Sequence, residues 1–442
     1  MQIRDFYRLS AVKRQLFSAF CSEYPRSKFM AFWIADLLDN LKIDGDFRED
    51  IAASLHSKAK DLLKDGDFHS ARSYFELASK KYQQCDDENS WLESLIAIAE
   101  CFELEADSRS SGSNVVANFF FENAIQAYRR IPTKHRAAYG VEEKIVSIRD
   151  KVVVSGKASL AEMDMLETPE IDISDIVKQS IAHVSGRRSS EEALLSFTSL
   201  FSGPKYKDLS ESAKEVMQKS LFSNLFGSSH MSSDGRVIAK TPAMNLGAGE
   251  DDPANKAALH RQIQQQLSIQ IQLVVEGQIL PALGQLLMEH RFRKEFMVAV
   301  CHHSPIVPQG REQLLGYALW LGFEYEFGAA IHLLCPQIEH IVRSQLKGAG
   351  AHTTNIDREG IENENGLSTL MEMEEALNLF GEDASFEMKS VFTDALGFNL
   401  RNEVAHGLLD DNASSSIHSI YAWWMLLRIV IRSLMDGNSK GS

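Results

Sequence analysis

Apolar residues recur at helical spacing along most of this chain. Over residues 30–150, and again from residue 255 onward, apolar positions return every three or four residues, which places them on one face of an α-helix. Between these stretches the pattern is less regular, and residues 227–253 are rich in Gly, Ser and Pro, which favour turns and boundaries. The pattern predicts a mainly all-α protein. Its parts are residues 1–150, an irregular helical or linker region over residues 151–254, and a C-terminal domain over residues 255–442.

The N-terminal part contains a segment that resembles the second half of a tetratricopeptide unit. Ala71, Phe75 and Ala78 stand at the spacing at which such a unit packs its two helices. A second copy begins at Ala124, farther from Ala71 than the roughly 34 residues of a regular repeat, so we expect residues 107–114 to form an inserted loop. We therefore predict an irregular, tetratricopeptide-like helical array that serves as a scaffold or binds a partner protein.

The segment Leu400–Leu409 combines an Arg, an Asn and a His directly before a Gly. On a helix, Asn402 and His406 lie four positions apart and share a face, so the amide can orient the imidazole. Arg401 carries a permanent charge on a long side chain that can reach the same cleft. A guanidinium that neutralises a phosphate, beside an imidazole that moves a proton, suits phosphodiester cleavage without a metal. The same residues also fit an ordinary helix end, with Gly407 after the last turn.

This segment resembles the signature of the HEPN superfamily, in which a His follows an Arg after four to six intervening residues. It is closest to one bacterial group, domain of unknown function family 4209. In that group a helix similar to Leu334–Arg343 precedes a variable loop and then the segment with the Arg and the His, and both blocks occur here in that order. The resemblance covers roughly residues 285–435. It implies a helical bundle whose two-fold homodimer brings Arg401 and His406 of both copies into one cleft that cuts RNA.

The resemblance also implies a role for each residue of the site. Two imidazoles act as the general base on the 2′-hydroxyl and the general acid on the leaving 5′-oxygen, while Arg401 stabilises the phosphorane. We expect Asn402 to orient His406. Glu339 and Arg343, on the facing helix, are expected to support the site. Glu339 fits equally well as a buried polar partner that holds the bundle together.

The charge of the chain limits how it can bind nucleic acid. The formal net charge of −15 argues against broad, sequence-independent binding, because such binding depends on neutralising many phosphates. Acidic residues far outnumber basic ones over residues 348–415. An enzyme that acts on RNA therefore needs a focused basic cleft, or a partner that presents the RNA.

Metal, secretion and membrane insertion are not indicated by the sequence. The five cysteines are scattered and form no CxxC pair, which fits reduced thiols in a cytosolic protein. The groups Cys301-His302-His303 and His332-x-x-Cys335 offer zinc ligands, but neither has a standard spacing, so we predict no metal and no cofactor. The start of the chain lacks a secretory pattern, and the longest near-apolar stretch, residues 423–431, is too short to span a membrane. We expect a soluble, cytoplasmic protein.

Three functions follow from these patterns. The first is a metal-independent RNA endonuclease of the HEPN type, in a toxin or anti-phage defence system. The second is a non-catalytic module for protein interaction and dimerisation, since a fold does not fix a function. The third is a nucleotide-sensing adaptor. A basic cleft around His406 favours the nuclease, whereas acidic walls favour the module. The acidic candidates are Glu372, Glu374, Glu375 and Glu403.

Overall fold

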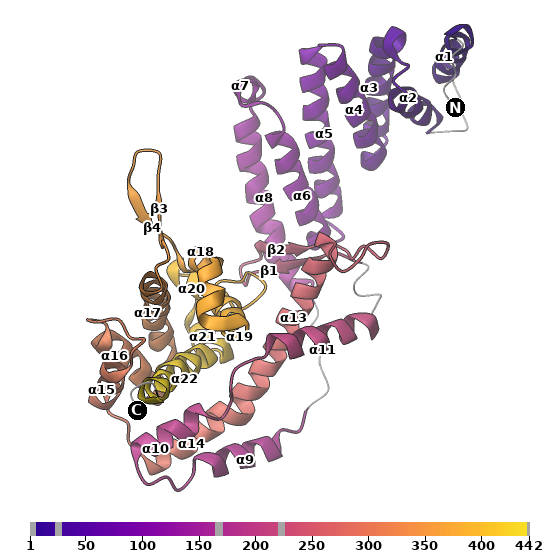
Figure 1. The fold of residues 1–442 in the computed structure, drawn as a ribbon. Coiled ribbons are helices and arrows are strands. Elements are labelled where there is room, and N and C mark those ends of the chain that lie inside the picture. The colour runs from indigo at the N-terminus through magenta and orange to yellow at the C-terminus, as the bar shows by residue number, and fades with distance from the viewer. Residues whose placement is uncertain (1–5, 23–28, 164–170, 220–225, 440–442) are drawn as a thin grey trace. The chain divides into compact units, whose positions relative to one another are not determined.

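The computed structural model describes residues 6–22, 29–163, 171–219 and 226–439 (Figure 1). The chain divides into two compact units, Met1–Glu167 with Met231–Val237, and Thr168–His230 with Ile238–Ser442. Within the described residues the regular structure is helical apart from two two-stranded sheets. The prediction of a mainly all-α protein is confirmed.

The first unit is a series of helices joined by short turns. Consecutive helices pack on each other, α3 on α4, α4 on α5, α5 on α6 and α6 on α8. The elements are α1 (Phe6–Cys21), α2 (Met30–Asn40), η1 (Gly45–Phe47), α3 (Arg48–Lys64), α4 (Phe68–Gln84), α5 (Glu88–Arg109), α6 (Asn114–Arg129), α7 (Thr133–Arg136), η2 (Ala137–Tyr139) and α8 (Val141–Ala161).

The helix-packing positions predicted in the first unit are buried. Ala71, Phe75, Ala78 and Ala124 are fully buried, and small residues at such positions let neighbouring helices approach closely. The expected loop over residues 107–114 is wrong in its extent. Helix α5 continues through Arg109, and a turn of four residues then leads into α6. The longer interval between the two copies therefore arises mainly from a longer helix.

The second unit is a larger helical bundle. Its first elements are α9 (Ser174–Val184), α10 (Ser190–Thr198), α11 (Tyr206–Lys219), β1 (Ser228–Met231), β2 (Val237–Thr241), α13 (Pro253–Val274), the π-helical turn η3 (Val275–Ile279), α14 (Leu280–Glu289), α15 (Lys294–His303) and α16 (Glu312–Phe323). Of the two strands, the end residues Met231 and Val237 are grouped with the first unit. The remaining elements are α17 (Phe327–Gly348), β3 (Thr354–Ile356), β4 (Glu362–Glu364), α18 (Leu367–Met371), α19 (Glu374–Phe392), α20 (Leu400–Ala405), α21 (Asp411–Ser414) and α22 (Ile417–Ser439). Strands β3 and β4 pair antiparallel, with Asn355 opposite Asn363.

Helix α22 forms the centre of the second unit. It packs against α10, α13, α15, α16 and α17, and both Trp423 and Trp424 are fully buried. The indole of Trp423 lies against Gly322 of α16, where an added Cβ would come within 2.0 Å of the ring. Only glycine permits this contact, because any side chain would push the two helices apart.

The middle region of the chain is divided between the two units. Helix α8 extends to Ala161 in the first unit, whereas residues 168–230 belong to the second. Phe197 of α10 is fully buried, its ring centroid lies 6.1 Å from that of Trp423, and its carbonyl oxygen accepts a hydrogen bond from Trp424 Nε1 at 3.3 Å. The apolar core of the second unit therefore begins well before residue 255.

One helical run, Pro253–Glu289, is long and apolar enough to cross a bilayer by length and composition alone. Of its most apolar 18-residue window, 44% is buried inside the structure. Ile271 is a core residue, and the buried Gln264 donates hydrogen bonds to Ser390 and Asp394. These contacts place part of the run in the core of the second unit.

Candidate active site

The segment with Arg401 and His406 begins at a sharply turned loop. Gly397 lies so close to Ser390 that an added Cβ would come within 2.2 Å of its carbonyl oxygen. That same oxygen accepts a hydrogen bond from the backbone N–H of Phe398 at 2.8 Å. Asn399 then adopts a left-handed conformation, with φ of 52°, which Asn tolerates better than most residues. The loop fixes where α20 starts, and α20 packs against α17 and α19.

Helix α20 has only six residues and ends directly before His406. The backbone N–H of Leu408 donates to the carbonyl oxygen of Glu403 at 2.8 Å, and that of Gly407 donates to the carbonyl oxygen of Val404 at 3.1 Å. Gly407 has a positive φ of 65°, so this is a Schellman cap. The alternative interpretation of this segment as an ordinary helix end is correct for its backbone. The cap also leaves the His406 side chain exposed to solvent.

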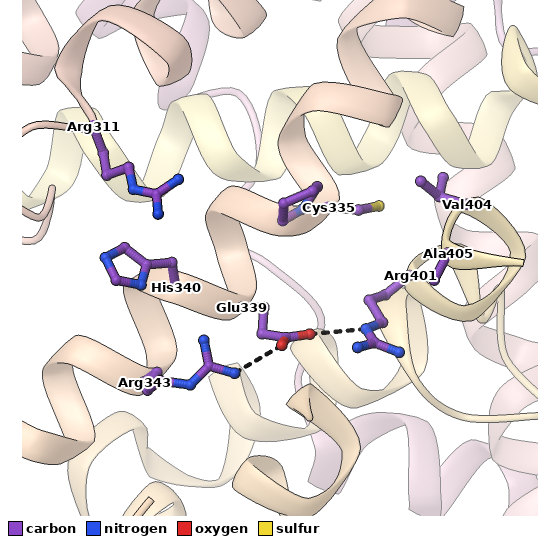
Figure 2. Close-up of a pocket in the computed structure, with 9 residues that line it drawn as sticks. Arg311, Cys335, Glu339, His340, Arg343, Arg401, Val404 and Ala405 are labelled. Atoms are coloured by element: carbon purple, nitrogen blue, oxygen red, sulfur yellow. Dashed lines mark hydrogen bonds and ion pairs between the residues drawn. The ribbon is translucent and has the colours of Figure 1, made fainter. Parts of the chain in front are cut away.

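Glu339 bridges two arginines from different elements (Figure 2). Its Oε2 accepts a hydrogen bond from Arg401 Nε at 2.8 Å, and its Oε1 accepts one from Arg343 Nη2 at 2.7 Å. Arg343 and Glu339 are one turn apart on α17, whereas Arg401 comes from α20. Arg343 Nη2 also donates to the carbonyl oxygen of Asn365, and its Nε lies 3.1 Å from Glu364 Oε2. Arg343 is therefore held by two hydrogen bonds from Nη2 and by an ion pair with Glu364.

The carboxyl of Glu339 is ionised at neutral pH. Burial by itself raises the pKa of Glu339, but the hydrogen bonds and positive charges of Arg343 and Arg401 outweigh it, so that the pKa lies below the ordinary glutamate value. A charged carboxylate holds a guanidinium more firmly than a neutral acceptor does. The position of Arg401 therefore depends on the charge of Glu339.

A cavity of about 310 Å³ opens beside this cluster. Its polar lining consists of Arg311, Glu339, His340, Arg343 and Arg401 (Figure 2). Three guanidinium groups and one carboxylate line the cavity, and a second carboxylate, Glu364, pairs with Arg343, so positive charge remains in excess by one. Such a surface attracts an anion, and guanidinium groups match phosphate and carboxylate oxygens in geometry.

His340 is an imidazole among cations in this cavity. Burial lowers the pKa of His340, and the charges of Arg311 and Arg343 lower it further. The ring is therefore neutral at neutral pH, and it makes no hydrogen bond to another described residue. A neutral imidazole can donate one proton in a hydrogen bond and accept another.

The structure brings together three of the five predicted site residues. Glu339, Arg343 and Arg401 meet at the cavity, as expected for a facing pair of helices. His406 does not line the cavity, but it follows Ala405, which does. Its imidazole therefore lies on the surface next to the segment that forms the cavity wall.

The prediction that Asn402 orients His406 is not met in this chain. Asn402 Nδ2 donates to Asn399 Oδ1 at 2.7 Å, and Asn402 Oδ1 accepts from Arg401 Nη1 at 3.3 Å. The expected contact required a helix that continues through His406, whereas α20 ends at Ala405. The amide instead secures the first turn of α20 and the guanidinium of Arg401.

Two residues of the cavity, Arg311 and His340, were not identified from the sequence. His340 stands between Glu339 and Arg343 in the block Leu334–Arg343, so its position beside two site residues was a signal. Arg311 gave no such signal, because it lies in the loop before α16. It reaches the cavity only because α16 packs on α17.

The acidic residues that would favour the non-catalytic module do not line this cavity. None of the four acidic candidates is among its lining residues, and one of them, Glu372, forms an ion pair with Lys389 at 2.8 Å.

The two cysteines of the possible zinc site are buried thiols and are not accessible to a metal ion from solvent. Burial raises the pKa of Cys301 and of Cys335 to about 12. Within the described ranges, no three His, Cys, Asp or Glu side chains are grouped so that they could hold a metal ion.

Comparison with known proteins gives no relative for this chain. No family model, no curated protein and no solved structure matches it. The resemblance to HEPN domains therefore rests on the two sequence blocks that contain Glu339 and Arg401. The geometry of the cavity is a separate observation about what those residues can bind.

Proposed function

We propose that this protein is a metal-independent RNA endonuclease of the HEPN type, acting in the cytoplasm in a toxin or anti-phage defence system. The observation that carries the proposal is the cavity at Arg401, which three guanidinium groups and one carboxylate line, with a second carboxylate, Glu364, beside Arg343. An excess of positive charge in a confined place suits a phosphodiester substrate. It also supplies the focused basic cleft that a chain with a net charge of −15 needs in order to bind RNA.

The proposed reaction uses the 2′-hydroxyl of the RNA as the nucleophile. A His406 imidazole takes the proton of this hydroxyl as its oxygen attacks the neighbouring phosphorus. The bond from phosphorus to the 5′-oxygen breaks, and a second, protonated imidazole gives that oxygen a proton. Arg401 neutralises the charge that builds up on the phosphorane. The products are a 2′,3′-cyclic phosphate and a free 5′-hydroxyl.

Two proton transfers require two imidazoles, and one chain has a single His406. We therefore propose a two-fold homodimer through the C-terminal domain, in which each copy supplies one Arg401 and one His406. The exposed position of His406 is suited to such a shared site. The N-terminal helical array would then be available to bind a protein partner that delivers RNA or controls the enzyme.

A non-catalytic dimerisation module is the second candidate. The observation in its favour is that Arg401 Nε is bound to Glu339 at 2.8 Å, as expected for a polar pair that only holds helices together. In that case the cavity would be a by-product of packing, and the purified protein would not cut RNA.

Incubation of the purified full-length protein with RNA in excess chelator decides between these candidates. The nuclease predicts cleavage that leaves 2′,3′-cyclic phosphate or 3′-phosphate ends, together with sedimentation as a dimer. Cleavage that requires added Mg²⁺ or Mn²⁺ would contradict the mechanism. A monomer that is fully active at nanomolar concentration would contradict the shared site.

A further inference from the structure

Part of the cavity is formed by residues that the proposed reaction does not use. Arg311, from the loop before α16, and His340, on α17, both line it. Within the part of the chain that the structure describes, the guanidinium of Arg311 makes no hydrogen bond or ion pair. A half-buried arginine without a partner is unusual, because burial of a charge is costly unless that charge is compensated.

The charges around Arg311 do not compensate it. Glu339 is the only carboxylate in the cavity lining, and both of its oxygens are already bound, to Arg401 and to Arg343. Arg401 has one terminal nitrogen, Nη2, for which the described residues offer no acceptor. The cavity thus presents unused donors on Arg311, His340 and Arg401.

These donors lie around one space. Figure 2 shows Arg311 and His340 on one side of the cavity and Arg401 on the other, with Glu339 between them and Arg343 below His340. Arg311, Arg343 and Arg401 exceed the two carboxylates, Glu339 and the Glu364 that pairs with Arg343, by one charge. A phosphate group matches this arrangement better than a carboxylate does, because it offers more acceptor oxygens to the separate donors.

We propose that Arg311, His340 and the free edge of Arg401 form a subsite that binds a phosphate group of the RNA substrate, next to the phosphate that is cut. This inference rests on the proposed function. The bound group is either a backbone phosphodiester or the terminal phosphate of the strand. In both cases Arg311 acts as a binding residue, while Arg343 holds Glu339 in place.

Binding is measured on the full-length protein in a His406→Ala background, so that no RNA is cut during the titration. The probes are inorganic phosphate and one short oligoribonucleotide with either a 5′-phosphate or a 5′-hydroxyl. The test variant is Arg311→Gln, and the matched control is Arg358→Gln, which removes the same charge from the exposed turn between β3 and β4. Isothermal titration calorimetry gives the dissociation constants.

We expect Arg311→Gln to weaken binding about ten- to a hundredfold, the effect of one charge-assisted hydrogen bond, and Arg358→Gln to change it less than about twofold. If Arg311→Gln weakens binding of the 5′-phosphorylated strand alone, the subsite binds the terminal phosphate. If it weakens binding of both strands equally, the subsite binds a backbone phosphate. A His340→Asn variant gives an independent check. It should weaken binding most for the probe whose binding Arg311→Gln weakens most. Equal binding by Arg311→Gln and its parent would overturn the subsite.

Failure of the subsite and failure of the proposed function give different results. If wild-type protein cuts RNA but Arg311→Gln binds and cuts equally well, the nuclease stands and the subsite is wrong. If the wild type cuts no RNA while phosphate binding still depends on Arg311, the subsite stands as an anion site and the nuclease is wrong.

Discussion

Two clusters of arginine and glutamate in the second unit have the same chemistry and different surroundings. In the core, Arg428 Nη2 donates to both oxygens of Glu387 at 2.6 and 2.5 Å, and the hydroxyl of Tyr421 lies 2.5 Å from the same carboxylate. At the cavity, Arg401 Nε donates to Glu339 at 2.8 Å. The side chains of the core pair are 3% and 5% exposed, whereas those of the cavity pair are 28% and 17% exposed.

The balance of charge differs as well. The core cluster has one arginine for one carboxylate, and the Trp424 ring lies 5.2 Å from the guanidinium of Arg428. The cavity cluster has Arg311, Arg343 and Arg401 for two carboxylates, Glu339 and the more exposed Glu364, and it borders an open space of about 310 Å³. Enclosure and charge balance, more than residue type, therefore separate a pair that holds the fold from one that can bind a ligand. The two clusters should therefore differ in how much stability and activity the protein loses when their arginine is replaced by Met.

Arg428→Met should have the largest effect. It leaves the buried carboxylate of Glu387 without its cation, which costs about 3–5 kcal/mol of unfolding free energy. Urea unfolding followed by circular dichroism measures this cost. Arg401→Met is the matched control and should cost about 1 kcal/mol or less, because its pair is partly exposed. Similar losses in the two variants would mean that the comparison between the clusters is mistaken.

Arg401→Met should instead reduce RNA cleavage, by about 10²- to 10³-fold. This is the effect of losing one group that stabilises charge in the transition state. Initial cleavage rates in excess chelator measure it, and Arg358→Met serves as the control that removes a charge outside the cavity. If Arg401→Met cuts RNA at the wild-type rate, Arg401 has only a structural role.

The pH dependence of stability should separate Glu339 from an ordinary surface carboxylate. Its pKa in the folded protein is lowered, since Arg343 and Arg401 outweigh the effect of burial. The contribution of the ionised carboxylate to stability is therefore present above the ordinary glutamate pKa of about 4.3 and is lost as the pH falls through the lowered pKa. The difference in unfolding free energy between wild type and Glu339→Gln should be constant from pH 7 to about pH 5 and shrink below about pH 4. If the difference in unfolding free energy grew on acidification, the pKa of Glu339 would be raised in the folded protein and not lowered.

The helical fold could be predicted from the sequence because apolar spacing is a local signal. The same spacing placed Ala71, Phe75 and Ala78 in the core of the first unit, where they are buried. It could not show that Phe197 packs beside Trp423, because that contact joins segments far apart in the chain. The short strands β3 and β4 lie in a polar stretch of the chain, where no apolar alternation predicts their pairing.

The candidate site was predictable only where its residues stand in contiguous motifs. Glu339, Arg343 and Arg401 belong to two such blocks, and they meet as expected. The role of Asn402 was not predictable, because it depends on α20 ending before His406. Arg311 was not predictable either, since the packing of α16 on α17 carries it to the cavity.

The most direct test of the account is the rate at which His406→Ala cuts RNA in excess chelator, measured beside wild type and His352→Ala. His406 and His352 are both exposed residues of the second unit, so neither substitution should disturb the fold. The account predicts that His406→Ala loses about 10²- to 10⁴-fold in rate, the usual cost of removing an acid–base group, while His352→Ala keeps the wild-type rate. Equal rates for all three proteins would contradict the assignment of His406 as the group that moves the proton.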